Sequence, residues 1–90
     1  MPYVYEIEKP SIFTESGQEM FLKIRDQIKA KIKIAGVVRM QEAISGCTGD
    51  MWKMMACVDR MVELKEITEI KSTSRIPGQF RIFMSADDLR

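Results

Sequence analysis

The side chains that most often catalyse reactions or bind metals are scarce in this chain of 90 residues, which contains no histidine. Its two cysteines, Cys47 and Cys57, stand ten residues apart and do not form a paired metal-binding motif. We expect both to be structural, reduced thiols. No nucleophile stands beside a base, and no carboxylates converge. The sequence therefore predicts a protein that is not an enzyme and uses no metal or cofactor.

The side chains left for chemistry are mainly cations, and several belong to the stretch Gly49–Ile67. Apolar residues recur there at three- and four-residue steps, which predicts a helix over about 50–65 with one buried face. That face comprises Met51, Met54, Met55, Val58, Met61 and Val62. Lys53, Ala56 and Arg60 fall on the outer face, and Trp52 lies at its edge. This outer face is either a binding surface or simply a solvated helix face.

The segments on either side of this helix predict a small α+β domain of three helices packed on a C-terminal β-hairpin. The first helix begins at Thr14 or Ser16, runs to about Lys33, and buries a stripe of four residues, Phe21, Ile24, Ile28 and Ile32. A very short strand over 37–39 and a short helix over 40–44 follow. After the helix at 50–65, strands over 67–71 and 79–84 flank a polar loop, residues 72–78, with a Pro-Gly turn signal.

Ninety residues support a single domain, with a body over 14–84. Residues 1–13 form an N-terminal arm. Within it Tyr3–Glu8 alternates like a strand, which predicts a strand or extended arm that packs on the body or pairs with a second copy. Residues 85–90 are expected to be a flexible tail.

The overall charge and hydropathy describe an ordinary globular chain. The formal net charge is +1, and 46% of residues are hydrophobic. Six cations between Lys23 and Arg39 face one acid, Asp26, which indicates a solvated helix face or a set of phosphate contacts. No apolar run reaches the length of a membrane span, and the N-terminus lacks the order of a signal peptide. We therefore expect a cytoplasmic protein without a membrane partner.

Two runs of sequence resemble a known family. Residues 36–49 (GVVRMQEAISGCTG) lead toward residues 57–67 (CVDRMVELKEI), and together they resemble winged helix-turn-helix proteins. The likeness is greatest to MarR-type and related bacterial transcriptional regulators, whose recognition helix ends in a pattern such as DRLVELGEI. It extends over roughly residues 14–84. The complete MarR-type proteins also have dimerisation helices, which this chain is too short to hold.

This resemblance implies a small transcriptional regulator that binds double-stranded DNA, acting as a homodimer. The helix at 50–65 would lie in the major groove, and the loop at 72–78 would be the wing. Lysine and arginine there would contact phosphates or guanines. The DNA-binding residues implied in this way are Trp52, Lys53, Ala56, Arg60, Lys71, Arg75 and Arg81.

Other residues of the same helix favour a protein partner. Asp50, Asp59 and Glu63 lie on or near its outward half and would repel phosphates. Trp52 suits a protein interface at least as well as a groove, or it packs against the first helix. The alternative function is therefore a winged-helix protein–protein interaction module that does not bind DNA and uses Trp52 with its apolar neighbours.

Overall fold

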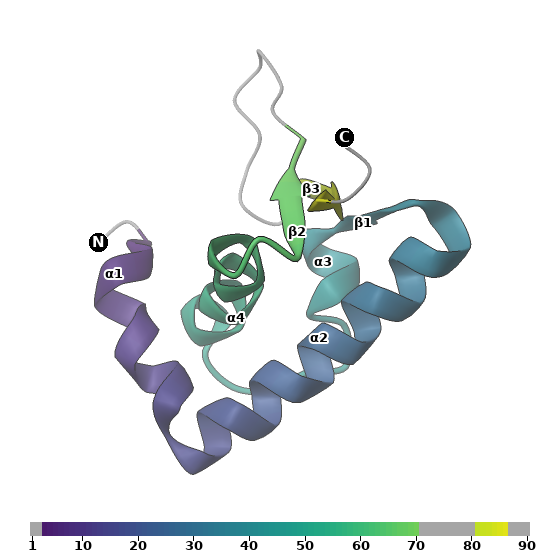
Figure 1. Cartoon of the computed structure of the whole chain (residues 1–90). Helices are drawn as coiled ribbons and strands as arrows, with labels where there is room; N and C mark the ends of the chain where they lie inside the picture. Colours follow the sequence, from purple (N-terminus) through teal and green to yellow (C-terminus); the bar gives the residue numbers. More distant parts are fainter. Residues whose placement is uncertain (1–2, 71–80, 87–90) are drawn as a thin grey trace.

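The computed structural model of the chain describes residues 3–70 and 81–86. The elements follow in the order α1 (Tyr5–Glu8), the 3-10 helix η1 (Lys9–Phe13), α2 (Glu15–Ala35), β1 (Val37–Arg39), α3 (Met40–Ala43), α4 (Met51–Glu63), β2 (Ile67–Glu69) and β3 (Ile82–Ser85). Helix α4 lies between the α1–η1 segment on one side and α2 on the other (Figure 1). The predicted small α+β fold is confirmed.

Helix α2 has a defined start and end. The Thr14 hydroxyl accepts a hydrogen bond from the amide of Gly17 at 3.0 Å, which makes Thr14 the N-cap. A β-carbon at Gly17 would lie 2.1 Å from the carbonyl oxygen of Ser11, so only glycine fits where η1 turns into α2. The helix ends at Gly36, whose φ of 82° is left-handed. Of the two predicted starts, Thr14 is therefore the one used.

Helix α4 begins after Asp50, whose carboxylate accepts a hydrogen bond from the amide of Trp52 at 2.9 Å. The predicted range of 50–65 thus consists of the helix, its caps Asp50 and Leu64, and the following residue Lys65. At the other end the amides of Lys65 and Glu66 return to the carbonyls of Val62 and Met61. This closure places Lys65 at a φ of 62°.

In the described part of the chain the sheet has three antiparallel strands in the order β1–β3–β2. The central strand β3 pairs with β1 through Val38 and Phe83, and with β2 through Thr68 and Met84. A C-terminal hairpin alone is therefore an incomplete description, because β1 adds a third strand. Strand β3 extends to Ser85, which corrects the prediction that the flexible tail begins at that residue. The predicted loop at 72–78 lies outside the described residues.

The core lies between α2, α4 and the sheet, with Ile24, Ile28, Val38, Met61 and Phe83 fully buried. Three of the six apolar residues assigned to the buried face of α4 are buried, namely Met54, Val58 and Met61. Met51 is 49% exposed, and Met55 and Val62 are half-buried. The buried surface of α4 is instead centred toward Ala56 and Cys57, because α4 packs against η1 as well as α2.

The N-terminal arm packs on α4, but it is not a strand. Its residues form α1 and η1, which lie along α4. The hydroxyls of Tyr3 and Tyr5 reach carboxylates of α4, Asp59 and Glu63, so long-range contacts decide the local structure. The alternation that predicted a strand therefore misassigned the element, while the expectation of a packed extension is correct.

Within the described part of the chain, no helix combines the length and apolar character needed to cross a membrane.

Candidate functional site

The outer face of α4 is the surface that sequence reasoning selected, and the N-terminal arm covers it. Both α1 and η1 pack against α4 on the side opposite α2 (Figure 1). Ala56 was expected on the open face, but its side chain is completely buried. The expectation that Ala56 is open to solvent is therefore wrong, because the arm lies over this side of α4, and its contact with DNA stays a prediction.

Glu63 gathers three donors at the C-terminal end of this face. The Tyr5 hydroxyl and the Lys9 ammonium donate to it at 2.8 and 2.9 Å, and Arg60 Nη1 donates at 2.6 Å. Hydrogen bonds from Lys9, Arg60 and Tyr5 lower the pKa of Glu63 to about 2. The Arg60 guanidinium also lies 5.3 Å from the ring centre of Phe13. Arg60 is therefore engaged inside the chain.

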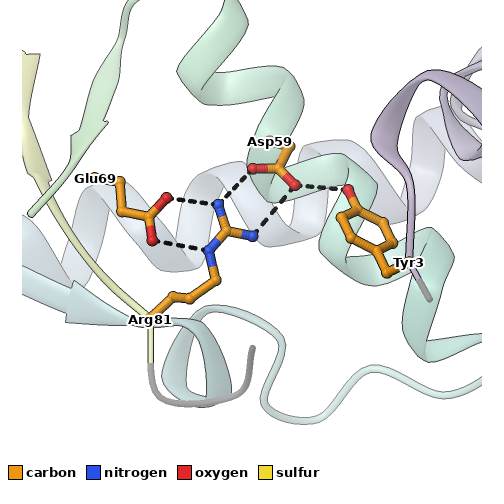
Figure 2. A network of polar contacts seen from close by, with 4 residues as sticks. All are labelled: Tyr3, Asp59, Glu69 and Arg81. Carbon is orange, nitrogen blue, oxygen red and sulfur yellow. Dashed lines mark hydrogen bonds and ion pairs between the residues drawn. The ribbon is translucent and has the colours of Figure 1, made fainter. Parts of the chain in front are cut away.

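Arg81 joins α4 to the two strands of the hairpin (Figure 2). Its Nη2 donates to Asp59 Oδ1 and Glu69 Oε1, both at 2.8 Å, and its Nε donates to Glu69 Oε2 at 3.0 Å. The Tyr3 hydroxyl donates to the remaining Asp59 oxygen at 2.6 Å. The side chains of Arg81 and Asp59 are only 18% and 14% exposed. Arg81 therefore neutralises two internal carboxylates.

The titration behaviour of this network agrees with its geometry. Burial favours the neutral form of Arg81, but the bonds to Glu69 and Asp59 outweigh it and raise the pKa of the guanidinium. Burial and the bond to Asp59 raise the pKa of the Tyr3 hydroxyl. Across ordinary pH the tyrosine therefore stays protonated and the arginine stays charged.

Trp52 and Lys53 lie at the N-terminal end of α4. The Trp52 ring meets the Tyr3 ring edge to face, with centroids 6.5 Å apart and planes at 65°. Trp52 thus packs against the arm. Packing against the first long helix was one of the alternatives that the sequence left open. Lys53 Nζ donates to the Ser16 hydroxyl on α2 at 3.1 Å and has no acidic partner among the described residues.

Of the seven residues that the resemblance implied for DNA contact, the five that the structure describes do not form a free basic surface. Arg60 and Arg81 are ion-paired, Ala56 is buried, Trp52 is half-buried, and Lys53 bonds to a hydroxyl. Lys71 and Arg75 lie outside the described residues. Several cations of the basic run of α2 also have partners within the chain. Lys29 pairs with Glu66 and Lys31 with Glu42, and Lys23 donates a hydrogen bond to the carbonyl of Gly46.

One apolar strip of α4 is only partly covered. Met51, Met55 and Val62 share a face by helical spacing, and Trp52 lies beside it. Sequence reasoning assigned the first three to the buried face: Met55 and Val62 do pack partly against the core, whereas Met51 is 49% exposed. The width of the apolar stripe was the sequence signal that some of these residues would not be fully buried. Six apolar positions in thirteen residues exceed what one narrow contact face covers.

The two cysteines are free, with Cys57 buried in the core and Cys47 half-buried. Burial raises the pKa of the Cys57 thiol to about 11, which keeps it protonated and unreactive at neutral pH.

Searches for similar proteins bring no further information on this site: no protein-family model, curated protein or solved structure matches this chain.

Proposed function

We propose that residues 14–84 form a winged-helix domain preceded by a packed N-terminal arm. The order of elements supports this proposal, since α2, β1, α3, α4, β2 and β3 follow one another as helix, strand, helix, helix, strand and strand. The pairing of β1 with β3 in an antiparallel sheet is a second support. In such a domain α3 and α4 would be the helix-turn-helix pair, and α4 its second helix.

We further propose that this domain binds protein and does not read DNA through α4. The observation that carries this proposal is the covered outer face of the helix. The arm lies where DNA would have to approach α4. The same face includes Asp59 and Glu63, whose charges already neutralise Arg60, Arg81 and Lys9. On this face a DNA backbone would meet Lys53 as a cation without an acidic partner among the described residues, beside the two carboxylates.

The partly covered apolar strip of α4 suits a protein partner. Methionine side chains adapt their shape to an apolar surface, and a tryptophan at the edge of such a patch is a frequent anchor of binding energy. We define the α4 patch as Met51, Trp52, Met55 and Val62. The simplest partner is a second copy of the chain, because two such patches on antiparallel helices are self-complementary about a two-fold axis.

Sedimentation velocity across a concentration series tests self-association through the α4 patch. Met51→Glu places a charge in the patch at a helix start, where an acid is favourable to the helix itself. Leu22→Glu is the matched control, because Leu22 is 45% exposed on α2, against 49% for Met51. We expect a concentration-dependent dimer that Met51→Glu dissociates and Leu22→Glu leaves intact. A wild-type chain that stays monomeric throughout would contradict this proposal.

DNA binding remains the second candidate function, favoured by the winged-helix order of elements. It requires cations from outside α4, and the sequence supplies Lys71 and Arg75 near the expected wing. In that case Met51→Glu would leave the complex with DNA intact, whereas Arg75→Ala would weaken binding to every duplex.

A further inference from the structure

A second surface, separate from the α4 patch, forms a pocket between the C-terminal parts of α2 and α4 and the ends of β2 and β3. Its volume is about 370 Å³, within the range of small-molecule sites. The apolar part of its lining comprises Ile28, Ile32, Met61 and Ile67, and the polar part comprises Lys29, Lys33, Lys65, Glu66 and Ser85. One wall is thus backed by the hydrophobic core, and the rim is mainly cationic.

The charges around this pocket do not cancel within the described residues. Lys29 pairs with Glu66, with 3.5 Å between ammonium and carboxylate. Neither Lys33 nor Lys65 has an acid within ion-pair distance among residues 3–70 and 81–86. Two lysines without an acidic partner therefore line a hollow with one apolar wall, and a low-dielectric wall strengthens the attraction of a nearby cation for an anion.

Lys65 occupies a backbone conformation that costs free energy for any residue with a β-carbon. Its φ of 62° is left-handed, and at the end of a helix glycine is the usual residue in that conformation. Nothing in the closure of α4 needs the side chain, since the amides of residues 65 and 66 make the closing bonds. The side chain instead lines the pocket, so the lysine adds charge at a position where glycine would be easier to accommodate.

We propose that this pocket binds a small organic anion, in which one carboxylate or phosphate group is attached to a short apolar body. The anionic group would lie between Lys33 and Lys65, with Lys29 beside it. The apolar body would lie along Ile32 and the core residues behind it. This site is independent of the α4 patch, because its lining includes none of the patch residues.

The test follows amide chemical shifts of the isotope-labelled full chain during titration at low ionic strength. Hexanoate and hexyl phosphate are the two anionic probes, and hexanol is the uncharged probe of similar length. We expect saturable shifts at residues 32, 33, 65 and 67 with an anionic probe and none with hexanol. Tighter binding of hexyl phosphate would assign the site to phosphate monoesters, and tighter binding of hexanoate to carboxylates.

Lys65→Gly separates binding from folding, because glycine accepts the left-handed conformation and the variant should fold at least as well. It should weaken the preferred anion about five- to tenfold. Lys31→Ala is the control, since Lys31 is on the same helix as Lys33 but pairs with Glu42 outside the pocket. Equal binding of hexanol, no saturation with any probe, or equal weakening by Lys31→Ala would overturn the proposal. Inorganic phosphate binding as tightly as hexyl phosphate would overturn the role of the apolar wall.

Discussion

At the scale of single residues, Arg81 shows how an expected DNA contact becomes an internal support. Its guanidinium lies between Asp59 of α4 and Glu69 of β2, and its own backbone is adjacent to β3 (Figure 2). A fork-shaped donor set suits two carboxylates, because each can accept parallel hydrogen bonds. The group therefore fixes the position of the hairpin strands relative to α4.

Replacing Arg81 by methionine should lower the free energy of unfolding by about 2–4 kcal/mol, because Asp59 and Glu69 would lose their partner in a partly buried place. Urea denaturation monitored by circular dichroism measures this loss. Lys29→Met is the control, since the Lys29–Glu66 pair is largely exposed and should be worth less than about 1 kcal/mol. Equal losses in the two variants would mean that Arg81 has no special structural role.

Cys57 should react far more slowly than Cys47 with a disulfide reagent at mildly alkaline pH. Its thiol is buried and its pKa is raised to about 11, so little thiolate is available. Cys47 is half-buried in the turn before α4. The colour yield with time should show one faster and one much slower thiol, and Cys47→Ser should remove the faster phase. Two thiols reacting at one common rate would contradict this assignment.

At the scale of elements, the N-terminal arm is attached in two different ways. Helix α1 has no fully buried residue, and its Ile7 is 62% exposed, so its attachment depends on the partly buried rings of Tyr3 and Tyr5 and on the polar bonds of these tyrosines and of Lys9. The next element, η1, contributes the buried Ile12. We infer that α1 can be removed at modest cost, whereas η1 belongs to the core.

Deleting residues 1–9 should lower the melting temperature measurably while leaving a cooperative transition. The loss of a few hydrogen bonds corresponds to about 1–2 kcal/mol, and each kcal/mol lowers the melting temperature of a domain of this size by about 4–8 °C. Ile12→Ala should cost more, about 2–4 kcal/mol, because it leaves a cavity. Differential scanning calorimetry compares the two. An unchanged melting temperature after the deletion would show that the arm contributes nothing.

The contribution of Glu63 to stability should depend on pH. Its folded pKa of about 2 lies below the ordinary value of 4.5, so its stabilisation is fully present above that ordinary value and is lost as pH falls toward 2. The stability difference between the wild type and Glu63→Gln should therefore shrink over this range. Urea titrations at several pH values measure it, with Glu15→Gln at the start of α2 as a control. A difference that stays constant down to pH 2 would argue against the three-donor arrangement.

The elements that depend on local sequence could be predicted, and those that depend on distant contacts could not. Helices α2 and α4, the short α3 and all three strands follow from apolar spacing, caps and β-branched residues near their own positions. The arm was misassigned because its conformation is decided by partners 54 to 58 residues away. The same limit applies to the site: Arg81 and Asp59 are 22 positions apart, and residue type alone does not reveal that they pair.

At the scale of the whole molecule, the distribution of charge bears on the two proposed functions. The formal net charge is only +1, and ion pairs engage Lys9, Lys29, Lys31, Arg60 and Arg81 within the described residues. Binding to duplex DNA relies on cations that are free to displace counterions from phosphates. The two arginines that α4 would use or contact, Arg60 and Arg81, are therefore already paired, which supports the proposal of a protein partner for this helix.

The α4 patch proposal therefore predicts no saturable binding of mixed-sequence duplex DNA, even at about 50 mM salt, where the non-specific electrostatic attraction is strong. Fluorescence anisotropy of a labelled duplex measures this. Deleting residues 1–9 provides a second sample, because it removes α1 from the outer face of α4 while most of η1 stays in place. That face still carries Asp59 and Glu63, so we expect the truncated chain to remain without affinity.

Binding by the full-length chain would reverse this conclusion, and its salt dependence would locate the contact. The logarithm of affinity should then fall with the logarithm of salt concentration by about 0.9 per neutralised phosphate. If the cations of the expected wing are responsible, Arg75→Ala should flatten the slope by about one unit and weaken all sequences alike. If Lys53 or Arg60 reads a guanine, its replacement should cost about 1–3 kcal/mol on one preferred site only. Since Arg60 is tied to Glu63, this second pattern also requires that ion pair to break, and it should be stronger after removal of the arm.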